Sequence, residues 1–214
     1  METIIGSPLI AGLEEEKYIL SLLKHIFRAE PKLEFLKEIK DIPEINEEKK
    51  LDKELNLIIR AVKKNQGRLA EFAEELAIEF ARLFIGPKKP PAVPFASFYL
   101  SETKTVMSEI TTYVRKKYLE AGMAVKNLYS VPEDSIGIEL EFIFYLSVKI
   151  GNLYENGNED EASRLFEMKN NFLNEHMALW VPAFADKILL STQEDFYKGA
   201  AAALHRVIQH QNEL

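Results

Sequence analysis

Apolar residues recur at helical intervals along almost the whole chain, and no other feature restricts the fold as strongly. Leu69, Phe72, Leu76, Phe80 and Leu83 follow one another at intervals of three and four, which places them on one face of an α-helix. No alternating pattern of strand length interrupts this periodicity. The sequence therefore predicts an all-α fold, with a single globular, bundle-like domain of about ten helices across residues 1–214.

One predicted helix is apolar on nearly every side. It covers Glu133–Ile150, and such a pattern is typical of a helix at the centre of a fold. Ser130 and Glu133 resemble a capping box, so we expect Ser130 to be the N-cap of this helix. The stretch 118–134 before it is the expected hinge between two helical groups.

Glycine and proline predict where other helices end. Gly86 and the proline after it are expected to end the helix that contains Leu69 and Leu83, and a helix over residues 102–121 is expected to end at Gly122. Pro182 is expected to interrupt or restart a later helix. The charged stretch 30–55 is expected to hold short helices over a solvated face.

Composition excludes several classes of function. The chain has 27 basic and 34 acidic residues and a net charge of -7, which argues against a nucleic-acid binder. It has no cysteine, so disulfides, thiol chemistry and Cys-ligated zinc are excluded. No run of about 18 apolar residues predicts membrane insertion, and the first residues do not resemble a secretory signal. We therefore expect a cytoplasmic protein.

The chain shows no catalytic or metal-binding motif. No glycine-rich phosphate loop and no HExxH pair occurs. His205 and His210 are five apart, so they do not share a helical face as residues four apart would. We expect no catalytic residue, no metal site and no cofactor.

Three segments stand out by their proline, glycine and aromatic content. The first, residues 79–102, holds a helix end, an LF-x-GP turn, a proline-rich stretch and an aromatic run, through Leu83, Phe84, Gly86, Pro87, Pro91, Pro94, Phe95, Ser97, Phe98 and Tyr99. The second, residues 131–146, contains Pro132, Asp134, Ser135, Gly137, Glu139, Leu140 and Phe142, and the third, residues 172–188, contains His176 and Trp180. In order and spacing they resemble the signature of the TorD/DmsD/NarJ family of cytoplasmic molybdoenzyme chaperones, with Ser135 where that family has a histidine.

The resemblance implies a TorD-like fold and a role in enzyme maturation. Members of this family bind the N-terminal twin-arginine signal peptide, the apo form of a molybdopterin oxidoreductase catalytic subunit, or both. They aid cofactor insertion and proofreading before export. We therefore expect a peptide-binding site at these motif residues, apart from Pro132, Leu140 and Phe142, and at Glu141, and we expect no enzymatic activity. The chain is expected to be a monomer or a domain-swapped dimer.

Physical reasoning indicates how such a site would bind. An exposed ion pair contributes roughly 0.2 to 1 kcal/mol, whereas about 400 Å² of buried apolar peptide surface gives on the order of 10 kcal/mol before entropic costs. We expect apolar contacts to supply the affinity and acids to set the orientation. The prolines would stiffen the loop that presents Phe95, Phe98 and Tyr99. The alternative is that the prolines end a helix and the aromatics fill the core.

Several residues of the second and third segments each have two interpretations. Asp134 either favours the helix dipole or faces the arginines of the signal peptide. Glu139 and Glu141 either pair with an internal Arg or Lys or face those arginines. Gly137, His176 and Trp180 either serve close packing and the core or line the peptide groove.

Two other functions stay open at this stage. One is a weak GTP-binding or hydrolysing protein, which predicts measurable turnover. The other is a generic all-helical ligand-binding or regulatory domain, which predicts neither turnover nor binding of a signal peptide. Binding of a signal peptide without turnover would distinguish the chaperone from both.

Overall fold

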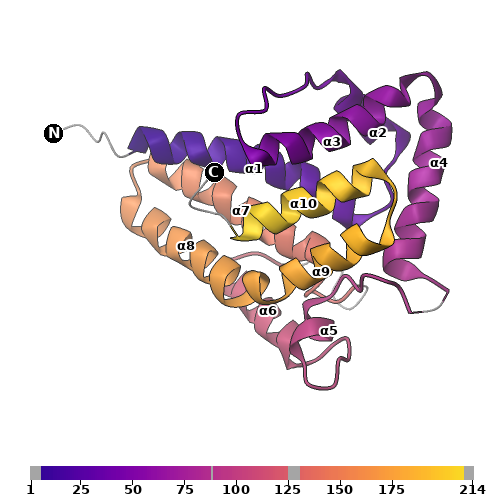
Figure 1. Cartoon of the computed structure of the whole chain (residues 1–214). Coiled ribbons are helices and arrows are strands. Elements are labelled where there is room, and N and C mark those ends of the chain that lie inside the picture. The colour runs from indigo at the N-terminus through magenta and orange to yellow at the C-terminus, as the bar shows by residue number, and fades with distance from the viewer. Residues whose placement is uncertain (1–5, 88, 125–130, 210–214) are drawn as a thin grey trace. The chain divides into compact units, whose positions relative to one another are not determined.

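The computed structural model describes residues 6–87, 89–124 and 131–209, and their fold is all-α, as predicted. The helices are α1 (Gly6–Arg28), α2 (Leu33–Asp41), α3 (Lys50–Lys64), η1 (Gln66–Arg68), α4 (Leu69–Phe80), η2 (Ala81–Ile85), α5 (Ala96–Leu100), α6 (Glu109–Glu120), α7 (Ile136–Glu155), α8 (Glu159–Phe172), η3 (Leu173–Met177), α9 (Ala178–Ser191) and α10 (Asp195–Gln209) (Figure 1). Within these ranges no strand forms, and one isolated antiparallel bridge joins Phe95 to Ser135.

The described chain divides into two compact units. The first comprises residues 6–25 and 95–180, apart from the segments that are not described, and the second comprises residues 26–94 and 181–209. Each unit therefore combines segments that are distant in the sequence.

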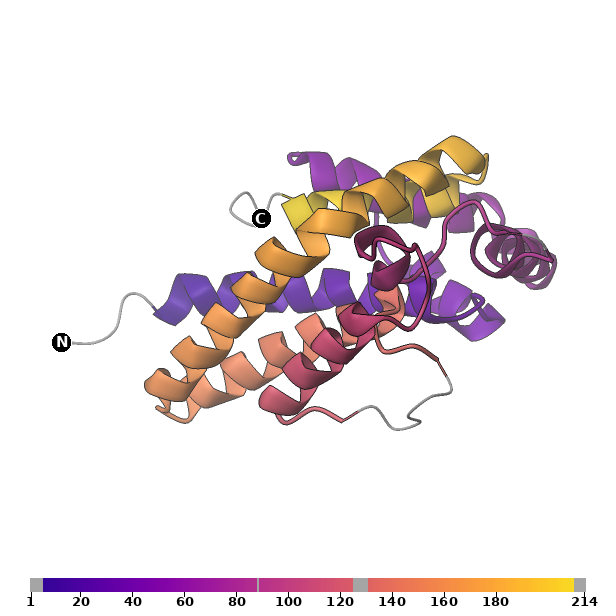
Figure 2. The same cartoon turned by 90° about the horizontal axis from the view of Figure 1, so that it is seen from below.

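In the first unit, α7 and α8 lie side by side (Figures 1 and 2). Leu140, Phe142 and Leu146 on α7 are fully buried, which confirms that this apolar helix lies inside its unit. Its predicted start was wrong, because α7 begins at Ile136 and Ser130 lies outside the described residues. Glu133 does not cap this helix, since its carboxylate is 2.7 Å from Arg115 Nη2.

The helix expected over residues 102–121 is shorter than predicted. It begins at Glu109, where the Ser108 side chain caps it by accepting a hydrogen bond from the amide of Ile110. The residues before Ser108 form a loop in which Lys104 and Met107 have positive φ, so no helix can continue through them. The end is as predicted, with Gly122 at φ +78° after the last turn.

In the second unit, α3 packs along α10 (Figure 1). Gly199 of α10 makes this approach possible, because a Cβ there would lie 2.7 Å from the carbonyl oxygen of Glu54. The Glu54 carboxylate accepts two hydrogen bonds from Arg206 Nε, at 2.8 and 2.9 Å. The charged stretch 30–55 does form helices, but α3 is 15 residues long and buries Leu51 and Leu55 against this unit.

π-helical turns precede two of the three expected helix breakers, Gly86 and Pro182. The η2 turn ends at Gly86, whose φ is +59°, as predicted. Pro182 does not interrupt its helix, because α9 runs through it from Ala178 to Ser191. A proline lacks an amide hydrogen and its ring clashes with the carbonyl four residues earlier. The wider π turn η3 ends directly before Ala178, whose carbonyl is the one four residues before Pro182.

Candidate functional site

The loop before α7 joins three helices of the first unit through Asp134. This carboxylate is fully buried. Its Oδ2 accepts a hydrogen bond from the Ser97 amide on α5 at 2.7 Å, and its Oδ1 accepts one from Thr111 Oγ1 on α6 at 2.8 Å. The Asp134 carbonyl also accepts a hydrogen bond from the Ala96 amide at 2.9 Å. One residue therefore fixes the positions of α5 and α6 relative to the start of α7.

A second buried carboxylate, Glu139, lies in the first turn of α7. Its Oε1 is 2.7 Å from His176 Nε2, and its Oε2 accepts a hydrogen bond from Trp180 Nε1 at 3.1 Å. All three side chains are almost completely buried. These two interactions join α7 to η3 and α9 in the first unit, and they give each oxygen of the Glu139 carboxylate a hydrogen-bond partner.

The pKa values of Glu139 and His176 are both raised in the fold, but for different reasons. Burial raises the pKa of Glu139, and His176 only partly opposes this effect. Burial alone would lower the pKa of His176, but the facing carboxylate outweighs it, so that the pKa is raised. The pair therefore holds a proton more tightly in the fold than the two separate groups do in the unfolded chain.

The aromatic residues after the proline stretch stack next to this pair. Tyr99 lies against Trp180, with ring centroids 5.5 Å apart, and Phe98 meets Tyr99 edge to face at 5.2 Å. Phe95, Phe98 and Tyr99 are each partly buried and partly exposed. We call these three residues the aromatic shelf. Trp180, on which Tyr99 stacks, is hydrogen-bonded to Glu139, and this buried contact keeps the orientation of the shelf fixed.

The third acid, Glu141, points away from this network. Lys24 Nζ lies 3.2 Å from its carboxylate and 3.8 Å from the centroid of the Phe144 ring. Glu141 therefore pairs with an internal lysine, whereas Glu139 pairs with His176 and Trp180. Of the three predicted acids, Glu141 alone retains solvent access, with 29% of its side chain exposed.

The predicted site residues divide between the two units. The first unit contains Phe95, Ser97, Phe98, Tyr99, Asp134, Ser135, Gly137, Glu139, Glu141, His176 and Trp180, and the second contains Leu83, Phe84, Gly86, Pro87, Pro91 and Pro94. The structure brings Phe98, Tyr99, Glu139, His176 and Trp180 together through direct contacts, and Ser97 joins Asp134. Phe95 joins Ser135 through the isolated bridge. Ser135 is the N-cap of α7, and Gly137 is buried in its first turn.

In the second unit, the LF-x-GP residues build a core. Phe84 contacts the rings of Phe184 and Tyr197, with centroids 5.9 and 6.1 Å away. Leu83 is fully buried, and its carbonyl accepts a hydrogen bond from the Ala92 amide at 3.1 Å. That bond closes the proline-containing segment back onto η2. Pro87 is exposed, and Pro91 and Pro94 are half-buried.

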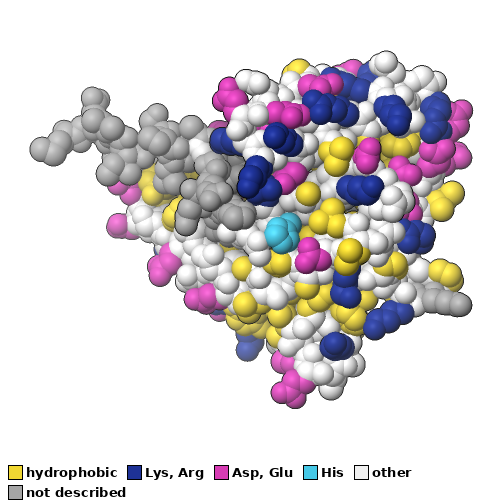
Figure 3. All heavy atoms as spheres, viewed as in Figure 1, with side chains coloured by type: hydrophobic (Ala, Val, Ile, Leu, Met, Phe, Trp, Pro, Cys, Tyr) yellow, Lys and Arg dark blue, Asp and Glu magenta, His cyan; other side chains and the backbone are white. Residues whose placement is uncertain are grey.

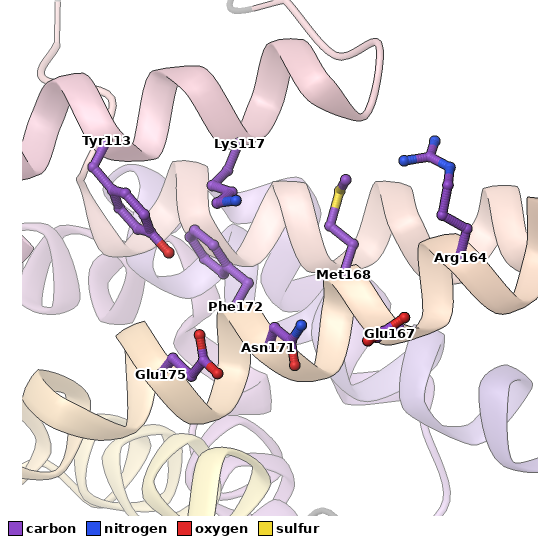
Figure 4. Close-up of a pocket in the computed structure, with 8 residues that line it drawn as sticks. All are labelled: Tyr113, Lys117, Arg164, Glu167, Met168, Asn171, Phe172 and Glu175. Atoms are coloured by element: carbon purple, nitrogen blue, oxygen red, sulfur yellow. The ribbon is translucent and has the colours of Figure 1, made fainter.

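A pocket of about 220 Å³ lies between α6 and α8 of the first unit, and our sequence analysis did not single it out (Figure 4). Its lining consists of Tyr113, Lys117, Arg164, Glu167, Met168, Asn171, Phe172 and Glu175. The spacing of four between Glu167, Asn171 and Glu175, and between Tyr113 and Lys117, was the available signal. That spacing shows a shared helical face but not which helix lies opposite.

The surface carries charged side chains of both signs. On the face of the described chain seen in Figure 3, basic and acidic side chains are interspersed, without a continuous basic area. Across the described ranges no helix is long and apolar enough to cross a membrane. Within the same ranges no three His, Asp or Glu side chains are grouped as a metal site would require.

Comparison with known protein families gives one match. The family described as nitrate reductase delta subunit matches residues 48–186, which is more than half of the chain. This range contains both acid networks, the aromatic shelf and the pocket between α6 and α8.

Curated relatives named chaperone protein TorD are similar to the chain at modest identity. The protein of Vibrio parahaemolyticus is 28% identical over 130 residues, which are 61% of this chain and 59% of that protein. The proteins of Vibrio cholerae (strain ATCC 39315) and Aliivibrio fischeri are 26% and 28% identical, over 76% and 79% of this chain and 72% and 74% of their own lengths. The chain thus spans about three fifths to three quarters of the length of these relatives.

Proposed function

We propose a function for this chain from one premise: it belongs to the nitrate reductase delta subunit family, which includes the TorD-like chaperones. We infer that it is a cytoplasmic maturation chaperone and not an enzyme. Its partner would be the catalytic subunit of a molybdopterin oxidoreductase. It would bind the twin-arginine signal peptide or the apo form of that subunit until the cofactor is inserted.

The observation that carries the proposal is the aromatic shelf together with the buried residues Glu139, His176 and Trp180 that support it. Phe98 and Tyr99 combine partial exposure with fixed stacking on Trp180. Exposed aromatic surface that is already ordered binds apolar peptide at a low entropic cost. Trp180 is held in turn by Glu139. The shelf therefore suits the apolar part of a signal peptide.

The acids then have separate roles in this proposal. Asp134 and Glu139 are buried and hydrogen-bonded within the fold, so they position the shelf and do not contact the ligand. Glu141 is half-exposed, and it would attract the arginines of the peptide in competition with Lys24. Because exposed ion pairs contribute little to affinity, Glu141 would affect orientation and association rate more than the dissociation constant.

Calorimetric titration with a twin-arginine leader peptide tests the shelf. The Phe98→Ala variant should bind about tenfold more weakly than the wild type, because it removes an apolar contact of roughly 1.5 kcal/mol. The matched control is Tyr18→Ala, which removes an aromatic ring that is 51% exposed on α1 and should leave the affinity unchanged. Equal affinity for Phe98→Ala and the wild type would exclude the shelf as the binding surface.

A second peptide tests the role of the acid. Replacement of both arginines by glutamines should weaken binding a few-fold at low salt and much less at high salt, because exposed charges are screened. Binding that disappears entirely at high salt would contradict an affinity based on apolar contacts.

A further inference from the structure

The pocket between α6 and α8 has an apolar floor and polar walls. In Figure 4, Tyr113 and Lys117 descend from α6, and the other lining residues lie along α8 and η3. Phe172 is 1% exposed and Met168 is half-buried, whereas 37% of Tyr113 is exposed at the rim. The Phe172 ring also lies 4.8 Å from that of His176. The floor is thus supported by the buried polar network.

The charges in this pocket are not balanced. Lys117 donates a hydrogen bond to Glu120 at 3.0 Å, and Arg164 makes two hydrogen bonds with Glu161, at 2.7 and 2.8 Å. Both cations are therefore neutralised by a glutamate of their own helix.

The two acids that line the pocket are not paired in this way. Among the described residues, neither Glu167 nor Glu175 makes a hydrogen bond or an ion pair within 4 Å. Glu175 interacts with Lys117 only through longer-range electrostatics. The remaining charge of the pocket is therefore negative, and a ligand that complements it carries positive charge.

The positions of these acids define a spacing. Glu167 and Glu175 are eight residues apart, which corresponds to about 12 Å along a helix at 1.5 Å per residue. Asn171 lies midway between them in Figure 4. In an extended peptide, side chains four residues apart point to the same face and are about 13 Å apart. The side chain between them, at the second position, points to that face as well.

We propose that this pocket is a second docking surface, which binds an extended basic segment of the partner polypeptide with cations at positions i and i+4 and an apolar side chain at i+2. The cations pair with Glu167 and Glu175, and the apolar side chain lies on Met168 and Phe172. Asn171 is placed to hydrogen-bond the backbone of the segment. This inference rests on the proposed function only in that the partner is a polypeptide.

The dimensions favour an extended segment over a helix. A helix with its side chains is about 10 Å wide, whereas a pocket of about 220 Å³ accommodates a few side chains. Acidic walls also disfavour nucleic acid and anionic lipid. A second copy of this chain is disfavoured because its net charge of -7 repels an acidic surface.

The test is an NMR titration of the ¹⁵N-labelled chain with a synthetic peptide of sequence Gly-Ser-Lys-Ser-Leu-Ser-Lys-Ser-Gly. The reference peptide has the same composition but a different spacing, Gly-Ser-Lys-Lys-Leu-Ser-Ser-Ser-Gly. We expect saturable shifts on α6 and α8 with the first peptide, and at least about threefold weaker binding of the second. Equal binding of both peptides, or shifts confined to other helices, would overturn the proposal.

The variant Glu167→Gln/Glu175→Gln should weaken binding of the spaced peptide about fivefold. The control is Glu102→Gln/Glu155→Gln, which removes the same charge from exposed positions outside the pocket and should bind as the wild type does. Loss of binding in both double variants would indicate a nonspecific charge effect and overturn the proposal. If the Glu167→Gln/Glu175→Gln variant changed the self-association of the chain and kept its affinity for the peptide, the proposal would also be overturned.

The two proposals fail independently. Failure of the pocket proposal leaves the leader-peptide titration and its Phe98→Ala variant unaffected. If the leader peptide does not bind while the spaced peptide does, the pocket proposal survives and the shelf is excluded.

Discussion

At the scale of the residue, buried carboxylates determine how this chain responds to pH and to substitution. Glu139 and Asp134 have all their oxygens hydrogen-bonded in the first unit. Removal of one partner from such a group leaves an uncompensated polar atom, which costs more than the intact interaction contributes. Substitutions at Glu139 and Asp134 should therefore affect the protein more than the distance of these residues from the shelf suggests.

The Glu139–His176 pair predicts a pH dependence of stability. Both pKa values are raised in the fold, from ordinary values of 4.5 and 6.5, so the native state keeps protons that the unfolded state has lost. The stabilisation by His176 is complete below about pH 6.5 and is lost as the pH rises through its raised pKa. The penalty for the buried Glu139 carboxylate likewise begins above about pH 4.5. The free energy of unfolding should therefore fall as the pH rises.

Urea unfolding at a series of pH values measures this slope. The variant Glu139→Gln/His176→Gln lacks both titrating groups, so its free energy of unfolding should change less between pH 5 and pH 8. The control Glu155→Gln/His205→Gln alters one Glu and one His outside the pair and should keep the wild-type slope. The same slope in all three proteins would contradict the role of the pair.

Close packing of α3 and α10 gives a second prediction at this scale. Gly199→Ala should lower the free energy of unfolding by about 2 kcal/mol, because its Cβ would clash with the Glu54 carbonyl and with Ile58 Cγ1, at 2.9 Å. Gly151→Ala on α7 meets nothing within 4 Å and should stabilise the chain by about 0.5–1 kcal/mol. Thermal and urea unfolding compare the two, and a neutral Gly199→Ala would contradict the packing.

At the scale of the element, Asp134 is the link between α5, α6 and α7. Asp134→Ala should cost about 2–3 kcal/mol of stability, since it leaves the Ser97 amide and Thr111 Oγ1 without their acceptor. Because α5 carries the shelf, the leader peptide should also bind more weakly. The control is Asp160→Ala in the first turn of α8, an exposed acid whose loss should cost less than about 1 kcal/mol. Equal costs for the two variants would refute the link.

The sequence predicts most elements because their signals are local. The apolar periodicity of α4, the end at Gly86 and the end at Gly122 depend on neighbouring residues only. The start of α7 does not, because Glu133 pairs with Arg115, which is 18 residues earlier. The position of Pro182 inside α9 was not predictable either, because the residues next to the proline do not indicate the π turn that precedes this helix.

The candidate site is less predictable than the elements. The motif residues are visible as a pattern, but the pattern does not show that Asp134 and Glu139 are buried whereas Glu141 is partly exposed. That difference arises from the packing of α1, α5 and α6 around α7. The pocket between α6 and α8 escapes sequence analysis altogether, because no spacing within one helix reports what lies opposite.

At the scale of the whole molecule, the chain combines a negative net charge with a partly exposed aromatic surface. The net charge of -7 favours the approach of a basic segment, and the shelf provides apolar contact area. The membership in the nitrate reductase delta subunit family gives these surfaces a common interpretation. The shelf and the pocket between α6 and α8 would together bind one polypeptide at two places, which raises affinity and specificity.

The most direct test of the central claim is capture of the native partner. The tagged chain is incubated with a lysate of its own source, and the bound proteins are identified by mass spectrometry together with their molybdenum content. We predict recovery of a molybdopterin oxidoreductase catalytic subunit that lacks its metal, with much lower recovery by Phe98→Ala and unchanged recovery by Tyr18→Ala. Recovery of no such subunit, or only of the metal-loaded enzyme, would contradict a chaperone that acts before cofactor insertion.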